Sequence, residues 1–244
     1  MVEFSVIIPA LDEEKRIARA IEETRRVFSA FNQPFEIIVV DDGSTDKTAD
    51  IVENFINNSS YSSSSGLTGG SGIILVRHRC NKGKGAAVKT GTAAAQGEWI
   101  LFLDGDLATH PSEFGKFLPY LSDYDVLIAS RRVAGAKIAE RQPLYRTWLG
   151  RLFNLCVRLY FGLPYHDTQC GFKAFRRKAL PLIADLSIDG WAFDVELLYR
   201  AEKSGLRIKE IPVVWRHGAA SHVRLRHAWR ILSDLRKIKG SSAV

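Results

Sequence analysis

The chain of 244 residues has little cysteine, little histidine and no long apolar run. Its three cysteines, Cys80, Cys156 and Cys170, are too few and too scattered for a disulfide framework or a zinc site, and their odd number favours reduced thiols. No stretch reaches the ~18 uncharged apolar residues that a membrane-spanning helix needs. Glu3 and Pro9 interrupt the apolar N-terminus, which disfavours a signal peptide. We therefore expect a cytoplasmic protein that does not span a membrane.

The composition and the distribution of charge narrow the class of protein. With 46% hydrophobic and 25% charged residues, the chain lies in the ordinary globular range, which excludes global disorder, collagen and coiled coil. Residues 1–130 carry 12 basic and 18 acidic side chains, whereas residues 131–244 carry 22 basic and 9 acidic ones. A basic surface attracts phosphate on nucleic acid, on an anionic membrane or on a small molecule. A basic surface that only aids solubility is the alternative.

Apolar runs and amphipathic stretches alternate along the first 130 residues. Five apolar runs predict buried strands, at residues 4–9, 35–40, 73–77, 99–103 and 125–130. Stretches between them predict helices, from Asp12 onward and at residues 45–56, 85–95 and 111–121. The alternation predicts an α/β fold with a mostly parallel central sheet and helices on both faces. Such sheets bind ligands at the carboxyl ends of their strands.

Two further helices are expected in the basic half. Residues 144–163 have an apolar side that includes Trp148, Leu152 and Leu159, with arginines on the other sides. One interpretation is a helix packed on the sheet. The other is a helix on a bilayer surface, with its arginines toward anionic headgroups. The second helix is expected to begin near Leu225, in a segment rich in arginine and lysine.

Acidic side chains directly follow three of the predicted strands. Asp12 and Ser44 or Thr45 are expected to cap the helices that come next. Asp104 and Asp106 are the most informative pair, because two carboxylates two residues apart at a strand exit can face one divalent cation. Mg²⁺ or Mn²⁺ fills its remaining positions with water and phosphate oxygens, so the pair predicts a metal-bound diphosphate.

Glycines accompany both the aspartate pair and a lysine. Gly105, between the two aspartates, permits close approach of a ligand. Lys84 is flanked by Gly83 and Gly85 at the start of a predicted helix, where free amides and the helix dipole can bind phosphate. The glycine patterns of phosphate loops and dinucleotide folds are absent, which disfavours nucleotide hydrolysis and dinucleotide redox chemistry. The first half thus predicts a site for a nucleotide-diphosphate-sugar.

Several segments together resemble a known family. The segments VIIPALDEE, EIIVVDDGSTD, NKGKGAAVKTG and FLDGDLATHP, in this order and spacing, resemble the family-2 glycosyltransferases of GT-A fold. In the second half, DTQCGFK and WAFDVE resemble the polyprenyl-phosphate sugar transferases, and most of all their dolichyl-phosphate β-glucosyltransferase branch. The resemblance covers nearly the whole chain, and it implies a GT-A fold followed by a basic C-terminal extension.

The resemblance also implies roles for residues that match the family's motifs. Asp104 and Asp106 match the carboxylates for Mg²⁺ or Mn²⁺ and the diphosphate, while Arg131 and Arg146 match basic residues near the sugar diphosphate and the acceptor phosphate. These four form the implied catalytic set. The implied substrate-binding set, whose first four members match nucleoside positions, is Pro9, Leu11, Glu13, Asp41, Asp42, Lys84, Asp104, Gly105, Asp106, Arg131, Asp167, Gln169, Lys173, Asp194, Glu196 and His222.

The chain departs from the family's pattern in three places. Where the mannosyl branch has a glutamine as a further metal ligand, this chain has Ala108, which disfavours GDP-mannose. A late lysine is replaced by His222, which is only partly protonated at neutral pH, with Arg224 or Arg226 as substitutes. The glucosyl enzymes carry an N-terminal membrane anchor that this chain lacks, so we expect peripheral contact with the cytoplasmic face of a membrane.

The expected reaction is inverting transfer of glucose from UDP-glucose to a polyprenyl phosphate of the dolichyl type. A phosphomonoester, with a second pKa of about 6, is already largely a dianion at neutral pH and needs no general base. One alternative is GDP-mannose-dependent transfer to the same acceptor. Another is transfer to a soluble hydroxyl, with Asp194 or Glu196 as the base. Nucleic-acid binding is disfavoured, because the basic C-terminal run contains no recognised nucleic-acid-binding motif.

The charge division and the motifs also predict the domain organisation. We expect residues 1–216 to form the catalytic domain, with a nucleotide-sugar half at residues 1–130 and an acceptor half at residues 131–216. Residues 217–244 are expected to form a basic helix or tail that faces a membrane.

Overall fold

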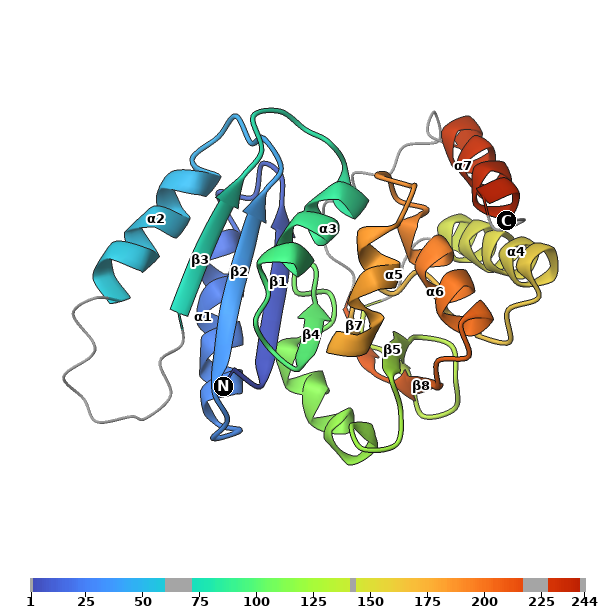
Figure 1. The fold of residues 1–244 in the computed structure, drawn as a ribbon, viewed down its shortest axis with the longest axis horizontal. Coiled ribbons are helices and arrows are strands. Elements are labelled where there is room, and N and C mark those ends of the chain that lie inside the picture. Colours follow the sequence, from blue (N-terminus) through green and yellow to red (C-terminus); the bar gives the residue numbers. More distant parts are fainter. Residues whose placement is uncertain (1, 60–71, 141–143, 217–227, 242–244) are drawn as a thin grey trace.

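The structure is a computed structural model that describes residues 2–59, 72–140, 144–216 and 228–241. A seven-stranded sheet forms the centre of this part of the chain (Figure 1). From edge to edge its strands are β3 (Gly72–Arg77), β2 (Phe35–Asp41), β1 (Phe4–Ala10), β4 (Trp99–Phe102), β7 (Lys173–Arg176), β5 (Val126–Ser130) and β8 (Ile208–Pro212). A separate pair of short strands joins β6 (Lys137–Ile138) to β9 (Val214–Trp215).

Helices cover both faces of this sheet, because successive residues of a buried strand point to opposite sides. Ile8 of β1 lies in an apolar cluster with one group of elements: α1 (Ile17–Ser29), α2 (Thr48–Ser59), η1 (Pro111–Lys116) and η2 (Leu118–Tyr120). Ile7 lies in the opposite cluster with the other group: α3 (Lys84–Ala94), α4 (Leu144–Phe161), η3 (Arg177–Ala179), α5 (Leu180–Ala184), α6 (Phe193–Lys203) and α7 (Ala228–Ser241). The predicted α/β class is confirmed.

The clearest differences from the predicted helices are in two places. The helix expected from Asp12 begins at Ile17, because Asp12 has a φ of 53° and turns precede the helix. The stretch at residues 111–121 forms the two 3-10 helices η1 and η2 rather than one α-helix, since Pro119 has no N–H to donate to an α-helical bond. The last helix is described from Ala228, so its expected start near Leu225 lies outside the described residues.

Strand β7 is antiparallel to both of its neighbours, β4 and β5. Its register places Lys173 beside Phe102. The chain therefore enters β7 at the edge where β4 ends, which brings residues 170–172 beside residues 103–106. Lys173, which the resemblance assigns to the substrate-binding set, is the first residue of this central strand. Within the described residues, no helix combines the length and the apolar character needed to cross a membrane.

Candidate active site

The loops that follow β1 and β2 are tied to each other by reciprocal hydrogen bonds. The amide of Asp12 donates to Ser44 Oγ at 2.9 Å, and the amide of Thr45 donates to Asp12 Oδ1 at 2.8 Å. Helix α1 starts without a side-chain cap, and Asp46 rather than Ser44 or Thr45 accepts from the Thr48 amide at the start of α2. The predicted capping roles are therefore wrong: these side chains fix one loop against the other.

The four residues expected to hold the nucleoside lie together on these loops. Pro9, Leu11 and Glu13 follow or end β1, and Asp41 ends the neighbouring parallel strand β2. Asp41 is buried, with its Oδ1 accepting from the Ser44 amide at 3.0 Å, whereas Pro9, Leu11 and Glu13 are partly exposed. The sheet thus gathers all four at its carboxyl edge.

Asp42 organises the turn before α3. Its carboxylate accepts from the amides of Lys82 at 2.9 Å and Gly83 at 2.8 Å, and it lies 2.7 Å from His78 Nδ1. The amides of Gly85 and Ala86 donate to the carbonyl of Asp189 at 2.8 and 3.3 Å. These four amides have partners within the protein and are not free to bind phosphate as the structure stands.

Lys84 instead brings its side chain to the aspartate pair. Its Nζ lies 2.5 Å from Asp104 Oδ1 and 5.3 Å from the ring centroid of Trp191. Burial lowers the pKa of Lys84, but the charges of Asp104 and Asp194 outweigh it and raise the pKa above its ordinary value. Burial and the charge of Asp104 raise the pKa of Asp106. Two carboxylates and a lysine thus share one partly buried site.

The aspartate pair has the chemistry of a divalent cation site. Asp106 is partly buried beside a second carboxylate, an arrangement that a nearby cation stabilises. Within the described ranges no group of three or more His, Cys, Asp or Glu side chains could hold a metal. The pair therefore fits a cation that takes its other ligands from water and phosphate oxygens.

Gly171 holds the 170–172 segment directly against Asp104. A Cβ built on Gly171 would lie 2.1 Å from Asp104 Oδ2 and 2.7 Å from Oδ1. Only a glycine lets the backbone approach the carboxylate this closely. This contact is the direct consequence of the antiparallel strand β7.

A second basic group, Arg131, lies beside the site at the end of β5. Its Nε and Nη2 donate to the two oxygens of buried Asp167 at 2.6 and 2.8 Å, and its guanidinium lies 5.4 Å from the ring centroid of Trp215. Burial lowers the pKa of Arg131, but Asp167 outweighs it and raises the pKa, with Asp104 adding to the increase. Glu210 of β8 accepts from the Asp167 amide at 2.8 Å. Arg131 is therefore a permanently charged cation in a fixed orientation.

Lys173 and Asp194 form an ion pair inside the core. Their charged atoms lie 2.6 Å apart, and the two side chains are 0% and 4% exposed. Lys173 Nζ also donates to the carbonyl of Cys170 at 2.5 Å. The pair thus links the segment that carries Gly171 to the first turn of α6.

Glu196, two residues beyond Asp194, belongs to a different network. Its oxygens accept from the Ser187 amide at 2.9 Å, from the Ile188 amide at 2.9 Å and from Arg200 Nε at 2.9 Å, and the residue is fully buried. The structure therefore does not bring Glu196 to Lys84 and the aspartate pair.

The remaining predicted residues are placed as follows. Gln169 is partly exposed on the segment between Asp167 and Gly171. Arg146 lies in the first turn of α4, and its side chain is outside the described part of the structure. His222 lies outside the described residues.

Sequence reasoning missed three residues of the site. Trp191, which is 40% exposed, lies over Lys84, and Trp215 lies over Arg131. Gly171 contacts Asp104. Trp191 and Gly171 lie in the segments WAFDVE and DTQCGFK, and their place in these segments was the signal that the sequence offered.

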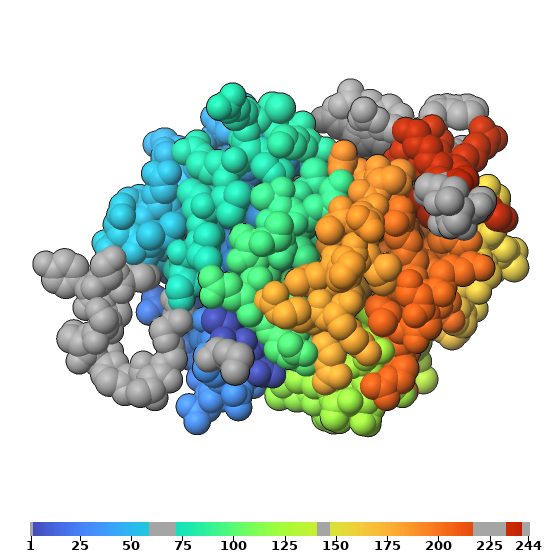
Figure 2. Space-filling view, viewed as in Figure 1, coloured from blue at the N-terminus to red at the C-terminus, as the bar shows by residue number. Residues whose placement is uncertain are grey.

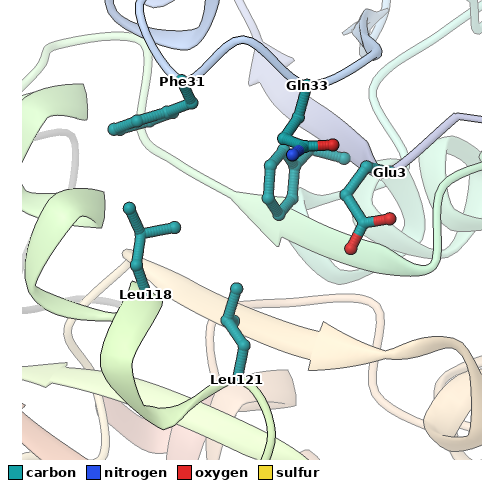
Figure 3. Close-up of a pocket in the computed structure, with 6 residues that line it drawn as sticks. Glu3, Phe31, Gln33, Leu118 and Leu121 are labelled. Atoms are coloured by element: carbon teal, nitrogen blue, oxygen red, sulfur yellow. The ribbon is translucent and has the colours of Figure 1, made fainter.

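A pocket of ≈ 450 Å³ lies at the opposite, amino edge of the sheet, near the start of β1 (Figure 3). It is lined by Glu3, Phe4, Phe31, Gln33, Leu118 and Leu121. None of the predicted site residues lines this pocket, so it is separate from the candidate active site.

Comparisons with known proteins show which family the sequence matches. The model of glycosyl transferase family 2 matches residues 5–182. A dolichyl-phosphate beta-glucosyltransferase of Trichomonas vaginalis is 34% identical over 95% of this chain and 69% of its own length. The enzyme of the same name from Homo sapiens is 32% identical over 87% of this chain and 67% of its own length.

A solved structure shows a similar fold at lower identity. It is the glucosyl-3-phosphoglycerate synthase of Mycobacterium tuberculosis in complex with Mn²⁺, UDP-glucose and phosphoglyceric acid. The TM-score is 0.66, with 20% identity over 98% of this chain and 80% of that one. This likeness confirms the predicted GT-A fold.

The buried ion pair generates a prediction about stability. Lys173→Met leaves Asp194 as an unpaired buried charge, so we expect it to lower the free energy of unfolding by about 3–5 kcal/mol. The double variant Lys173→Met/Asp194→Leu removes both charges and is expected to recover most of this loss. Urea unfolding followed by circular dichroism measures both. A single variant as stable as the parent would contradict the prediction.

The close approach at Gly171 generates a second prediction. Gly171→Ala places a methyl group where the Asp104 carboxylate lies, so we expect binding of UDP together with Mn²⁺ to weaken by about tenfold or more. Gly115→Ala is the matched control, because an added Cβ there meets nothing within 4 Å. Isothermal titration calorimetry measures the affinity, and equal affinities of the two variants would show that Gly171 is irrelevant to the site.

Proposed function

The chain belongs to glycosyl transferase family 2, and from this premise we propose that it transfers glucose from UDP-glucose to a polyprenyl phosphate of the dolichyl type, inverting the anomeric carbon. The proposal places the enzyme peripherally on the cytoplasmic face of a membrane. Its acceptor class is that of the named relatives, and its donor is the one in the structurally similar synthase.

One observation carries the choice of a phosphate acceptor. A hydroxyl acceptor needs a general base, and Asp194 and Glu196 were the two candidates from the sequence. Asp194 is paired with Lys173, and Glu196 is saturated by backbone amides and Arg200. Both are buried. A phosphomonoester needs no base, because it is already largely a dianion at neutral pH. The geometry therefore favours the phosphate over the hydroxyl.

In the proposed mechanism, the chain's own residues hold two anionic reactants close together. Pro9, Leu11, Glu13 and Asp41 would hold the nucleoside at the ends of β1 and β2. Asp104 and Asp106 would hold a Mg²⁺ or Mn²⁺ ion, which when bound stabilises the charge of the leaving diphosphate. These residues fix the donor with its anomeric carbon open to attack.

Two cations would complete the arrangement. Lys84, whose Nζ lies 2.5 Å from Asp104 Oδ1, would contact a diphosphate oxygen of the donor. Arg131, held by Asp167, would offset the repulsion between the incoming phosphate and the diphosphate. In-line attack by the acceptor oxygen forms the new glycosidic bond to carbon as the bond to the diphosphate breaks, which converts the α linkage to β.

The proposed reaction predicts a donor- and metal-dependent transfer of label to lipid. The purified protein with labelled UDP-glucose, polyprenyl phosphate and Mn²⁺ should move label into the organic phase, whereas labelled GDP-mannose should not. Asp106→Ala should lower the rate by about 100-fold or more, because the charge on the leaving group loses its stabilisation. Asp123→Ala, at an exposed acidic position, is the matched control.

Three outcomes would overturn parts of this proposal. If label reaches the lipid from GDP-mannose and not from UDP-glucose, the donor is GDP-mannose and the mannosyl alternative is correct. Label found only on a water-soluble acceptor would replace the lipid phosphate with a hydroxyl acceptor. Full activity of Asp106→Ala would remove the metal site.

The ion pair of Arg131 with Asp167 generates a separate prediction about the acceptor. Arg131→Lys keeps a positive charge beside Asp167 but loses the bidentate hydrogen bonds of the guanidinium. We therefore expect KM for polyprenyl phosphate to rise by about tenfold or more. Arg146→Gln is expected to act in the same direction. Binding of UDP with Mn²⁺ should change little in either variant. Arg19→Gln, at an exposed position of α1, is the control, and unchanged acceptor kinetics in both test variants would remove these arginines from the acceptor site.

A further inference from the structure

Helix α4 carries most of the large apolar side chains that the described residues expose. Eight such side chains are exposed in the described residues, and six of them lie on α4. These six are Trp148, Leu149, Leu152, Leu155, Leu159 and Tyr160. The most exposed are Trp148 at 70% and Leu159 at 76%. We call this set the α4 stripe.

The α4 stripe is not the face by which the helix packs on the protein. Val157 and Phe161 lie in the core cluster with residues of α6, Phe153 packs against that cluster, and Asn154 is buried. The helix is therefore apolar on two sides, one covered by the protein and one exposed. A helix that only packs on a sheet has polar side chains on its outer face, so the stripe requires a partner of its own.

The charges around the α4 stripe identify the kind of partner. The 18 residues of α4 include no aspartate or glutamate, and Arg151 of the same helix is exposed. Helix α7 lies alongside, in red next to the yellow α4 in Figures 1 and 2. Lys239 of α7 donates to the Tyr160 carbonyl at 3.2 Å and lies 4.3 Å from the Tyr160 ring centroid. Arg236 and Lys237 of α7 are exposed.

An apolar stripe bordered by arginine and lysine fits an anionic bilayer surface. Leucines can enter the acyl region, while Trp148 and Tyr160 suit the headgroup level and the basic side chains meet lipid phosphates. A second copy of the chain fits less well, because two such surfaces would bring like charges together.

We propose that α4 is the membrane-docking helix of this protein, lying in the plane of an anionic bilayer with the α4 stripe inserted. The inference rests on the proposed function in one respect, since a polyprenyl phosphate is held in a bilayer. Helix α4 is also tied to the acceptor side of the site, because Arg132, next to Arg131, donates to the Gly150 carbonyl at 2.8 Å. Docking through α4 would therefore place Arg131 near the lipid headgroups.

The test compares vesicle binding by the full chain and by variants of the α4 stripe. We expect the parent to sediment with phosphatidylcholine vesicles that contain phosphatidylglycerol. We expect the triple variant Leu152→Ser/Leu155→Ser/Leu159→Ser to lose about tenfold or more of this partitioning. Ile138→Ser, at an exposed apolar residue away from α4, is the control and should bind like the parent. Circular dichroism checks that each variant is folded.

Tryptophan fluorescence locates the inserted surface independently. Lipids brominated on their acyl chains should quench the parent, and Trp148→Phe should remove most of that quenching. Equal vesicle binding by the triple variant and the parent would overturn the inference. So would a parent that ignores vesicles and forms a dimer that the triple variant cannot form, because a second copy would then cover the stripe.

A short-chain prenyl phosphate in detergent separates this inference from the proposed function. If both are right, the triple variant keeps transfer to the detergent-dispersed acceptor and loses transfer to an acceptor in vesicles. If the parent binds vesicles through α4 but glucosylates neither acceptor, membrane docking by α4 is supported and the proposed function is wrong. If the triple variant glucosylates the acceptor in vesicles as fast as the parent, docking by α4 is wrong and the proposed function is supported.

Discussion

The buried ion pair of Lys173 and Asp194 is the interaction on which the geometry of the site depends. It joins the start of an antiparallel strand to the first turn of α6 and holds the Cys170 carbonyl from inside the core. The segment on one side of this pair places Gly171 against Asp104, and the segment before α6 places Trp191 over Lys84. A fully desolvated pair tolerates little displacement, because separating its charges leaves each without a partner. The pair therefore fixes the positions of the two segments that carry Gly171 and Trp191 to the site.

The sequence predicted those parts of the molecule that local patterns determine. Continuous apolar runs identify buried strands, and the residues directly after such runs must meet at one edge of a parallel sheet. Asp41, Asp104 and Asp106 were found in this way, and Lys84 was found as a glycine-flanked lysine at the start of a predicted helix. The strand β7 was missed, because its four residues include a lysine whose burial depends on a carboxylate 21 residues away. No local pattern contains that information.

The same limit explains the side chains whose surroundings were misjudged. Asp12 looks like a helix cap in the sequence, but its partner is Thr45 on another loop. The start of α3 looks like a phosphate site, but the carbonyl of Asp189 occupies its amides. In both cases a polar group has a partner far along the chain, and no local pattern in the sequence identifies that partner. For α4 the sequence left two interpretations open, and the structure shows why: the helix is apolar on both its packed and its exposed side.

The contact between Lys84 and Asp104 means that the site carries its own counter-ion. If the proposed cation and donor bind here, the cation would compete with Lys84 for Asp104, and a lysine displaced from a carboxylate would need another anion. The diphosphate of the proposed donor would be such an anion. Metal and nucleotide would then bind by an exchange of partners, and by linkage each would increase the affinity for the other. Such a site would select the two together over either one alone.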